Sequence, residues 1–132
     1  MIAVAVVAVI TAIALPSFKS SMQKSRRADA IAAFAGIQQA QERWRGNNPS
    51  YTTALSSLGV TPPQLYTLSL GTPAGASLTT GYVVVAEGIG SQADDLACKR
   101  MSVQMVNGNV GYGACESCTT FTYGPTNPCF SR

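Results

Sequence analysis

Four cysteines gather in the last third of the chain: Cys98, Cys115, Cys118 and Cys129. Cys115-Glu-Ser-Cys118 is a CxxC motif, which occurs in redox pairs, zinc knuckles and structural disulfides. A thioredoxin-like pair normally opens a helix after a buried strand, and the sequence indicates no such helix here. A four-cysteine zinc site normally has two such knuckles, whereas this chain has one. We therefore expect two structural disulfides, as is typical of a small exported domain.

The other side chains that could do chemistry argue against catalysis. The chain has no His, which is the commonest general base and the commonest metal ligand. Nine Lys or Arg and six Asp or Glu give a net charge of +3. That charge is too small and too scattered to indicate a nucleic-acid-binding stripe by itself. We expect no enzyme, no cofactor and no metal site.

An uncharged apolar run opens the chain. Residues 1–18 carry only two polar side chains, Thr11 and Ser17. As a helix they would rise roughly 27 Å, close to the lower limit for crossing a hydrocarbon core of about 30 Å. A segment of this kind could be a retained membrane helix, a cleaved signal peptide or a buried core helix. A cleaved signal peptide would begin with basic residues and end at a small-residue cleavage site. We favour a retained membrane helix, and we expect the natural N-terminus to lie before Met1.

The helix is predicted to continue to Arg45. Residues 19–45 contain no Pro, a single Gly and many good helix formers. The large apolar side chains of this part share one face, about 140° wide: Ile31, Phe34, Ile37 and Trp44. Gly46 and the following Asn-Asn-Pro end the helix. The sequence thus predicts one long helix, kinked at Pro16, of which about half lies outside any small head domain.

The remainder of the chain is predicted to be β-structure. Residues 66–70 and 82–86 are rich in strand formers, and Asn107–Gly108 favours a type I′ turn between residues 99–106 and 109–113. That turn sets Val106 opposite Asn109. Strand alternation then places three apolar side chains on one face, which we expect to pack on the helix: Met101, Val103 and Met105.

The same register favours one disulfide pairing. Cys115 falls opposite Arg100, on the same sheet face as Cys98 and one diagonal step away. We therefore predict Cys98–Cys115, which leaves Cys118 to pair with Cys129. Composition alone does not choose among the three possible pairings.

These residues resemble the type IV pilins. The stretch VAVITAIALPSFKSSMQKSRRADAIAAFAGIQQAQERW is similar to their long N-terminal helix, especially ALPSF followed by KSRRADA. NNPSYTTALSSLG resembles the next region of major-pilin-like members of the type IVa class, and the tail ending in CFSR resembles their disulfide-closed C-terminal loop. The resemblance implies an α+β fold with one long N-terminal helix on an antiparallel sheet of about four strands. Some relatives suggest the rival pairing, Cys98–Cys129 with a tight Cys115–Cys118 ring.

The resemblance also implies a structural function. The subunit would lie in the inner membrane and then polymerise through its helix, with the pilus assembly machinery, into an extracellular homo-oligomeric filament. Such pili serve adhesion, twitching motility or DNA uptake, so DNA or a host surface is a further expected partner. The alternatives are a minor pilin, a type II secretion pseudopilin and a membrane-tethered binding module. Pseudopilins often carry acidic calcium ligands near the C-terminus, whereas Glu116 is the only acid after Asp95.

We expect two regions with different roles. Residues 1–24 would form the membrane and filament-core half of the helix. Residues 25–132 would form the head, from the helix half 25–45, the loop 46–80, and the sheet and C-terminal loop 81–132. The expected filament-core residues are Met1, Val4, Ala5, Ala8, Ala12, Leu15, Pro16 and Phe18. Three alanines among them recur at near-helical spacing, so neighbouring helices can approach closely.

Overall fold

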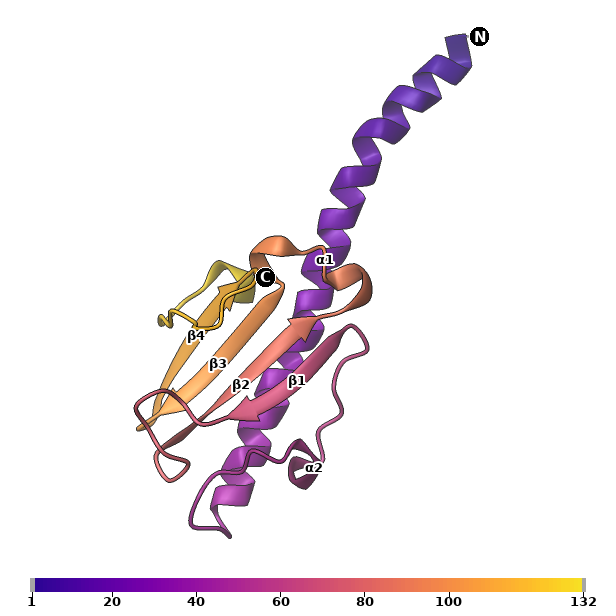
Figure 1. Cartoon of the computed structure of the whole chain (residues 1–132). Helices are drawn as coiled ribbons and strands as arrows, with labels where there is room; N and C mark the ends of the chain where they lie inside the picture. The colour runs from indigo at the N-terminus through magenta and orange to yellow at the C-terminus, as the bar shows by residue number, and fades with distance from the viewer. Residues whose placement is uncertain (1, 132) are drawn as a thin grey trace.

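A long helix dominates the computed structural model, which describes the backbone of residues 2–131 and the side chains of residues 17–131. Helix α1 spans Ile2–Arg45, and Arg43 and Arg45 in its last turn suit the helix dipole. The second half of α1 packs under the sheet, whereas the first half projects from the head (Figure 1). Most of the expected filament-core side chains lie outside the described ones, and Phe18 is 65% exposed. Across the described residues, no helix is long and apolar enough to span a membrane.

The head is built on a four-stranded antiparallel sheet in the order β1-β2-β3-β4. Its strands are β1 (Tyr66–Gly71), β2 (Gly81–Gly88), β3 (Arg100–Val106) and β4 (Asn109–Cys115). A short helix, α2 (Leu55–Leu58), lies between α1 and β1. Three 3-10 turns complete the chain: η1 (Gly90–Gln92), η2 (Leu96–Cys98) and η3 (Pro128–Phe130). The arrangement agrees with the expected α+β architecture.

The β3–β4 hairpin has the predicted register. Val106 pairs with Asn109, and Val103 pairs with Tyr112. Asn107 and Gly108 both have positive φ, 51° and 81°, as the type I′ turn requires. This register turns one face of β3 toward α1 and the other face away from it.

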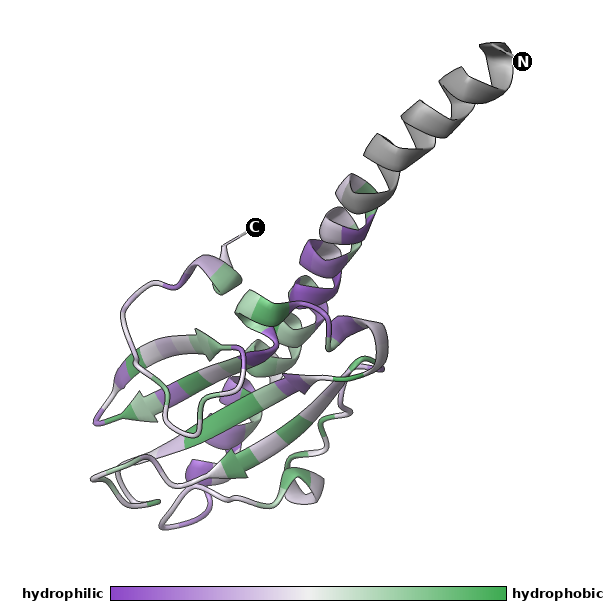
Figure 2. Ribbon diagram, turned by 45° about the horizontal axis from the view of Figure 1, so that its top comes forward, coloured by the Kyte–Doolittle hydropathy of each residue, from purple (hydrophilic) through white to green (hydrophobic). Residues whose placement is uncertain are grey.

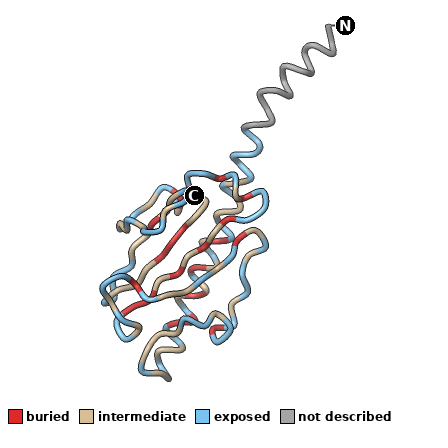
Figure 3. The backbone as a smooth tube through the Cα atoms, viewed as in Figure 1, coloured by how far each residue is buried: buried red, intermediate tan, exposed pale blue. Residues whose placement is uncertain are grey.

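The core lies between α1 and the inner face of the sheet. Buried stretches follow β2 and β3 in Figure 3. Among the residues expected at the helix–sheet contact, four are buried: Phe34, Ile37, Met101 and Val103. The other three, Ile31, Trp44 and Met105, are half-buried and pack against this core from its margin. The apolar contact is therefore tightest in the middle of the helix–sheet interface and looser at both margins.

The C-terminal segment covers part of the outer face of the sheet. Gly124 forms a two-way backbone bridge with Tyr112 at the free edge of β4. A Cβ atom on Gly111 would lie 3.0 Å from the Cβ of Tyr123, so glycine is needed where the segment crosses β4. The Tyr123 hydroxyl lies 2.8 Å from the Ser102 hydroxyl, which explains why Ser102 is buried although it points away from α1.

The disulfide pairing that we predicted from the hairpin register is wrong. Cys98 is joined to Cys129, and Cys115 is joined to Cys118. Cys98 lies in η2 rather than on a strand, so the alternation of side chains along a strand does not apply to it. β4 ends at Cys115 and the chain turns at once, which brings Cys118 back to its nearest cysteine.

Candidate functional site

Three loops meet at the end of the head that lies away from the projecting half of α1. They are residues 46–54 after α1, residues 72–80 between β1 and β2, and the β3–β4 turn (Figure 1). The Tyr51 amide donates to the Leu78 carbonyl at 2.8 Å, and the Asn107 amide donates to the Thr80 carbonyl at 2.9 Å. These contacts join the loops into one surface, which we call the distal surface.

The distal surface combines two arginines with neutral polar groups. From Gly46 to Ala86 the chain carries no charged residue at all. The Arg45 guanidinium donates to the Asn48 and Thr79 carbonyls at 3.1 and 3.2 Å, and it lies 5.6 Å from the centroid of the Tyr51 ring. Arg45 is thus fixed in place, whereas Arg43, on the preceding part of the last turn, is exposed. Exposed asparagines, among them Asn47 and Asn107, add amide donors and acceptors.

One acidic side chain lies beside this surface. The Tyr51 hydroxyl donates to Glu42 Oε1 at 3.1 Å. Partial burial and the neighbouring Glu42 carboxylate raise the pKa of Tyr51. The hydrogen bond uses part of the acceptor capacity of Glu42, while Arg43 and Arg45 supply the opposite charge within the same helical turn.

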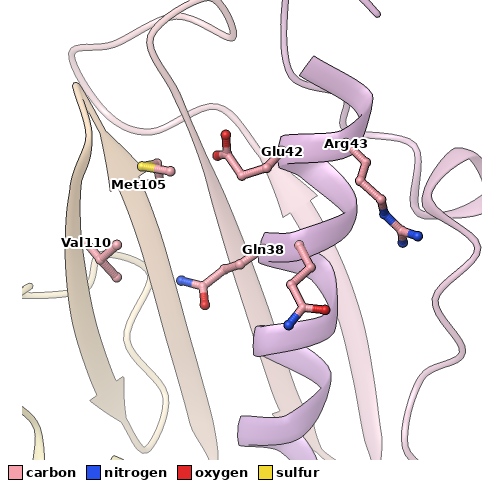
Figure 4. A pocket seen from close by; sticks show the side chains of 6 residues that line it. Gln38, Glu42, Arg43, Met105 and Val110 are labelled. Carbon is pink, nitrogen blue, oxygen red and sulfur yellow. The ribbon is translucent and has the colours of Figure 1, made fainter. Parts of the chain in front are cut away.

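A shallow groove of about 580 Å³ continues the distal surface along α1. Helix residues Gln38, Gln39, Glu42 and Arg43 line one side, and Met105 and Val110 line the other. In Figure 4, Gln38 and Glu42 point from α1 toward the hairpin, whereas Arg43 points away from it. The groove therefore sets hydrogen-bonding side chains opposite an apolar wall, and Val110 is 37% exposed on that wall.

The opposite end of the head, where α1 leaves it, is held by charge; we call it the neck end, and it includes residues 89–99. The Arg27 guanidinium donates to both carboxylate oxygens of Asp95 at 2.6 Å, and Asp95 is 4% exposed. Gln92 Nε2 donates to Asp95 at 2.9 Å. The bond to Asp95 raises the pKa of Arg27, which outweighs the opposing effect of burial. α1 is mainly hydrophilic here (Figure 2), so this end fastens the β2–β3 connection to the helix.

The sequence gives no local signal for this polar cluster. Arg27 and Asp95 are 68 residues apart, and each looks like an ordinary surface residue in its local sequence. In the part of the chain that the structure describes, no three or more metal-ligating side chains come together. The four cysteines are all used in disulfides.

A comparison with known protein families identifies a family that this chain matches. A family model described as "Type IV minor pilin ComP, DNA uptake sequence receptor" matches residues 16–102. The matched region includes the second half of α1, β1, β2 and the first residues of β3. No curated protein matches the chain.

Proposed function

The chain belongs to this family of type IV minor pilins, and from that premise we propose that it displays a DNA-binding head on a pilus used for DNA uptake. The sequence resembles major-pilin-like members and favours a structural subunit, with a minor pilin as an alternative. The family match supports a minor pilin better than a major, structural subunit.

One observation carries the assignment of DNA to the distal surface. At that end of the head, three polar loops meet beside Arg43 and Arg45. No acidic residue occurs in the sequence from Gly46 to Ala86, which contains two of these loops. Phosphate groups are commonly bound by Arg, Asn and backbone amides. The distal surface offers all three, whereas Arg27 at the neck end is half-buried and already paired with Asp95.

The groove supplies the chemistry that reading a base sequence requires. A glutamine amide such as that of Gln38 can both donate to and accept from the edge of an adenine. Apolar side chains such as Met105 and Val110 suit the methyl group of thymine. We therefore propose that Arg43 and Arg45 position the DNA backbone and that the groove contacts base edges.

DNA binding by the full chain in detergent micelles tests this proposal. Fluorescence anisotropy with a labelled duplex over a salt series should give a slope of log affinity against log salt near −2, because about two phosphates are neutralised. Arg43→Gln should weaken binding to all sequences and flatten that slope by about 1. The matched control Lys99→Gln lies at the neck end and should change neither quantity.

Three results would contradict this proposal. Complete absence of binding would remove the DNA function. A larger effect of Lys99→Gln than of Arg43→Gln would move the site to the neck end. Gln38→Ala should reduce the preference among duplex sequences without changing the salt slope, and an unchanged preference would remove the groove from base recognition.

We further propose that residues 1–24 place the subunit in the inner membrane and then in the pilus through contacts with copies of the same helix. Two observations support this: the apolar run of residues 1–18, and the projection of the first half of α1 from the head. A chain that begins at Ser25 should stay folded and fail to enter filaments, as judged by electron microscopy of sheared pili. Filaments that contain the shortened chain would contradict this part of the proposal.

A further inference from the structure

The two disulfides lie in different surroundings. Cys98–Cys129 is buried, with exposed fractions of 2% and 6%, and it joins η2 to η3. Cys115–Cys118 closes a ring between residues only three positions apart, immediately after β4. Both of its cysteines are half-buried, and Glu116 and Ser117 between them are exposed. An external thiol can therefore reach the second disulfide far more easily than the first.

Two groups beside the sulfurs favour a sulfur anion: a backbone amide, and Arg100 of β3, which also lies 3.6 Å from the Glu87 carboxylate. Arg100 pairs with Cys115 across the hairpin, and its guanidinium donates to the Cys118 carbonyl. The backbone amide of Cys118 donates to Cys115 Sγ at 3.2 Å. A neighbouring cation and a hydrogen-bond donor both favour the thiolate form of cysteine. Cys115 is thus the sulfur better able to leave as an anion.

We propose that Cys115–Cys118 is a thiol-exchange site, which a dithiol reductant opens in the folded protein while Cys98–Cys129 stays closed. A thiolate of the reductant attacks Cys118 Sγ, forms a mixed disulfide with it, and displaces the Cys115 thiolate. The second thiolate of the reductant then attacks its own first sulfur and releases the Cys118 thiolate. The reductant leaves as an internal disulfide, two electrons pass to the ring, and two protons complete its thiols.

Opening the ring changes how the outer face of the sheet is covered. The Arg100 guanidinium lies 5.6 Å from the centroid of the Phe121 ring as well as bonding to Cys118, so it ties the chain beyond β4 to β3. Without the ring, residues 119–127 keep the Arg100–Phe121 contact, the Ser102–Tyr123 contact and the Tyr112–Gly124 bridge, but they lose the covalent constraint that holds Cys118 at the end of β4. This segment then opens more often while the helix–sheet core stays intact. This inference is independent of the proposed DNA function.

Timed alkylation of the full chain in detergent micelles tests the exchange site. During treatment with dithiothreitol, mass spectrometry should find Cys115 and Cys118 alkylated at least about tenfold sooner than Cys98 and Cys129. Hydrogen exchange in residues 119–127 should rise at the same stage, before exchange in β2 and β3 changes. Simultaneous alkylation of all four cysteines, or alkylation of the ring only under denaturing conditions, would overturn the proposal.

Variants of two adjacent cations separate the role of Arg100 from general destabilisation. Arg100→Gln should slow ring opening by about three- to tenfold, because the leaving sulfur loses its neighbouring cation. Arg100→Lys keeps a cation and should restore most of the rate, and Lys99→Gln should leave the rate unchanged. Equal rates in wild type and Arg100→Gln would overturn the assignment of Arg100 as the cation that favours the Cys115 thiolate.

Discussion

The neck end and the distal end of the head are stabilised by different interactions. At the neck end, an ion pair and a buried disulfide tie α1, the β2–β3 connection and the C-terminal segment together. At the distal end, the loops are joined by backbone hydrogen bonds and by neutral or cation–carbonyl contacts. Arg27 and Asp95 at the neck end are paired with each other, whereas Arg43 at the distal end is exposed.

This difference indicates how the fold and the proposed function are divided. Charged groups that are buried and paired specify where α1 joins the head, because breaking such a pair is costly. Loops that are closed by backbone bonds leave their side chains available to a partner. Changes at the neck end should therefore cost mainly stability, and changes at the distal end should cost mainly binding.

The largest expected effect comes from comparing two aromatic side chains of α1. Phe34 is 3% exposed and stacks on Phe130, with 5.7 Å between ring centroids, next to the buried disulfide. Phe34→Ala should lower the free energy of unfolding by about 3–5 kcal/mol. Trp44, nearer the distal end, is half-buried, and Trp44→Ala should cost roughly half as much. Urea unfolding measures the free energy of unfolding of both variants. A larger loss for Trp44→Ala than for Phe34→Ala would contradict this prediction.

A second test compares an arginine at each end. Arg27→Met keeps the alkyl chain but leaves the buried Asp95 carboxylate without its partner, which should cost about 3 kcal/mol. Arg45→Met removes hydrogen bonds to carbonyls that water can replace, and should cost about 1 kcal/mol. Adding Asp95→Asn to Arg27→Met should recover part of the loss, since the unpaired charge is gone. Equal losses for the two arginines would show that the distal end depends on charge as strongly as the neck.

A third test uses one buried tyrosine near each end. Burial, with Asp95 nearby, raises the pKa of Tyr66 to about 12, and burial likewise raises the pKa of Tyr82, which packs on Tyr51. In the unfolded chain both tyrosines ionise near pH 10 while the folded protein keeps their protons. Stability is thus unaffected below pH 10 and falls as the pH rises, by about 1 kcal/mol for each tyrosine at pH 11.

Phenylalanine variants show how much of the stability lost at high pH comes from the tyrosine at each end. Tyr66→Phe and Tyr82→Phe should each remove about half of the stability loss seen above pH 10. Each variant also removes a buried hydroxyl that has no hydrogen-bond partner among the described atoms. Melting temperatures between pH 8 and 11 measure the effect. The same alkaline slope in the double variant and in wild type would show that neither tyrosine is responsible.

The smallest expected effect lies at the turn of the distal surface. Asn107 has a φ of 51°, a conformation that asparagine and glycine tolerate better than other residues. Asn107→Ala should cost up to about 1 kcal/mol, and Asn107→Gly only a few tenths. If alanine were as stable as glycine at this position, turn conformation would contribute little to the distal end.

The features that could be predicted from the sequence are those with local signals. Gly46 marks the end of α1, and Asn107–Gly108 sets the register of the β3–β4 hairpin. The order of the four strands follows from short connections between antiparallel neighbours. Each of these features depends on residues that lie close together in the chain.

The features that could not be predicted depend on contacts between distant residues. The Cys98–Cys129 bond depends on how η2 folds back toward the C-terminus, and strand alternation does not describe that path. Gln41 is fully buried because its amide bonds both the amide and the carbonyl of Thr52, at 3.1 and 2.7 Å, which hydrophobic periodicity does not reveal. The Arg27–Asp95 pair likewise appears only once α1 and the β2–β3 connection are brought together.

The place of the Arg27–Asp95 pair has a mechanical consequence. If a filament is pulled through α1, tension enters the head where that helix leaves it, which is the position of this pair. The load there would run along the helix axis and shear the helix against the sheet, so many side-chain contacts would resist it together. Arg27 and Asp95 would act as the first clamp, and the distal surface, at the far end of the head, would bear the least of the strain.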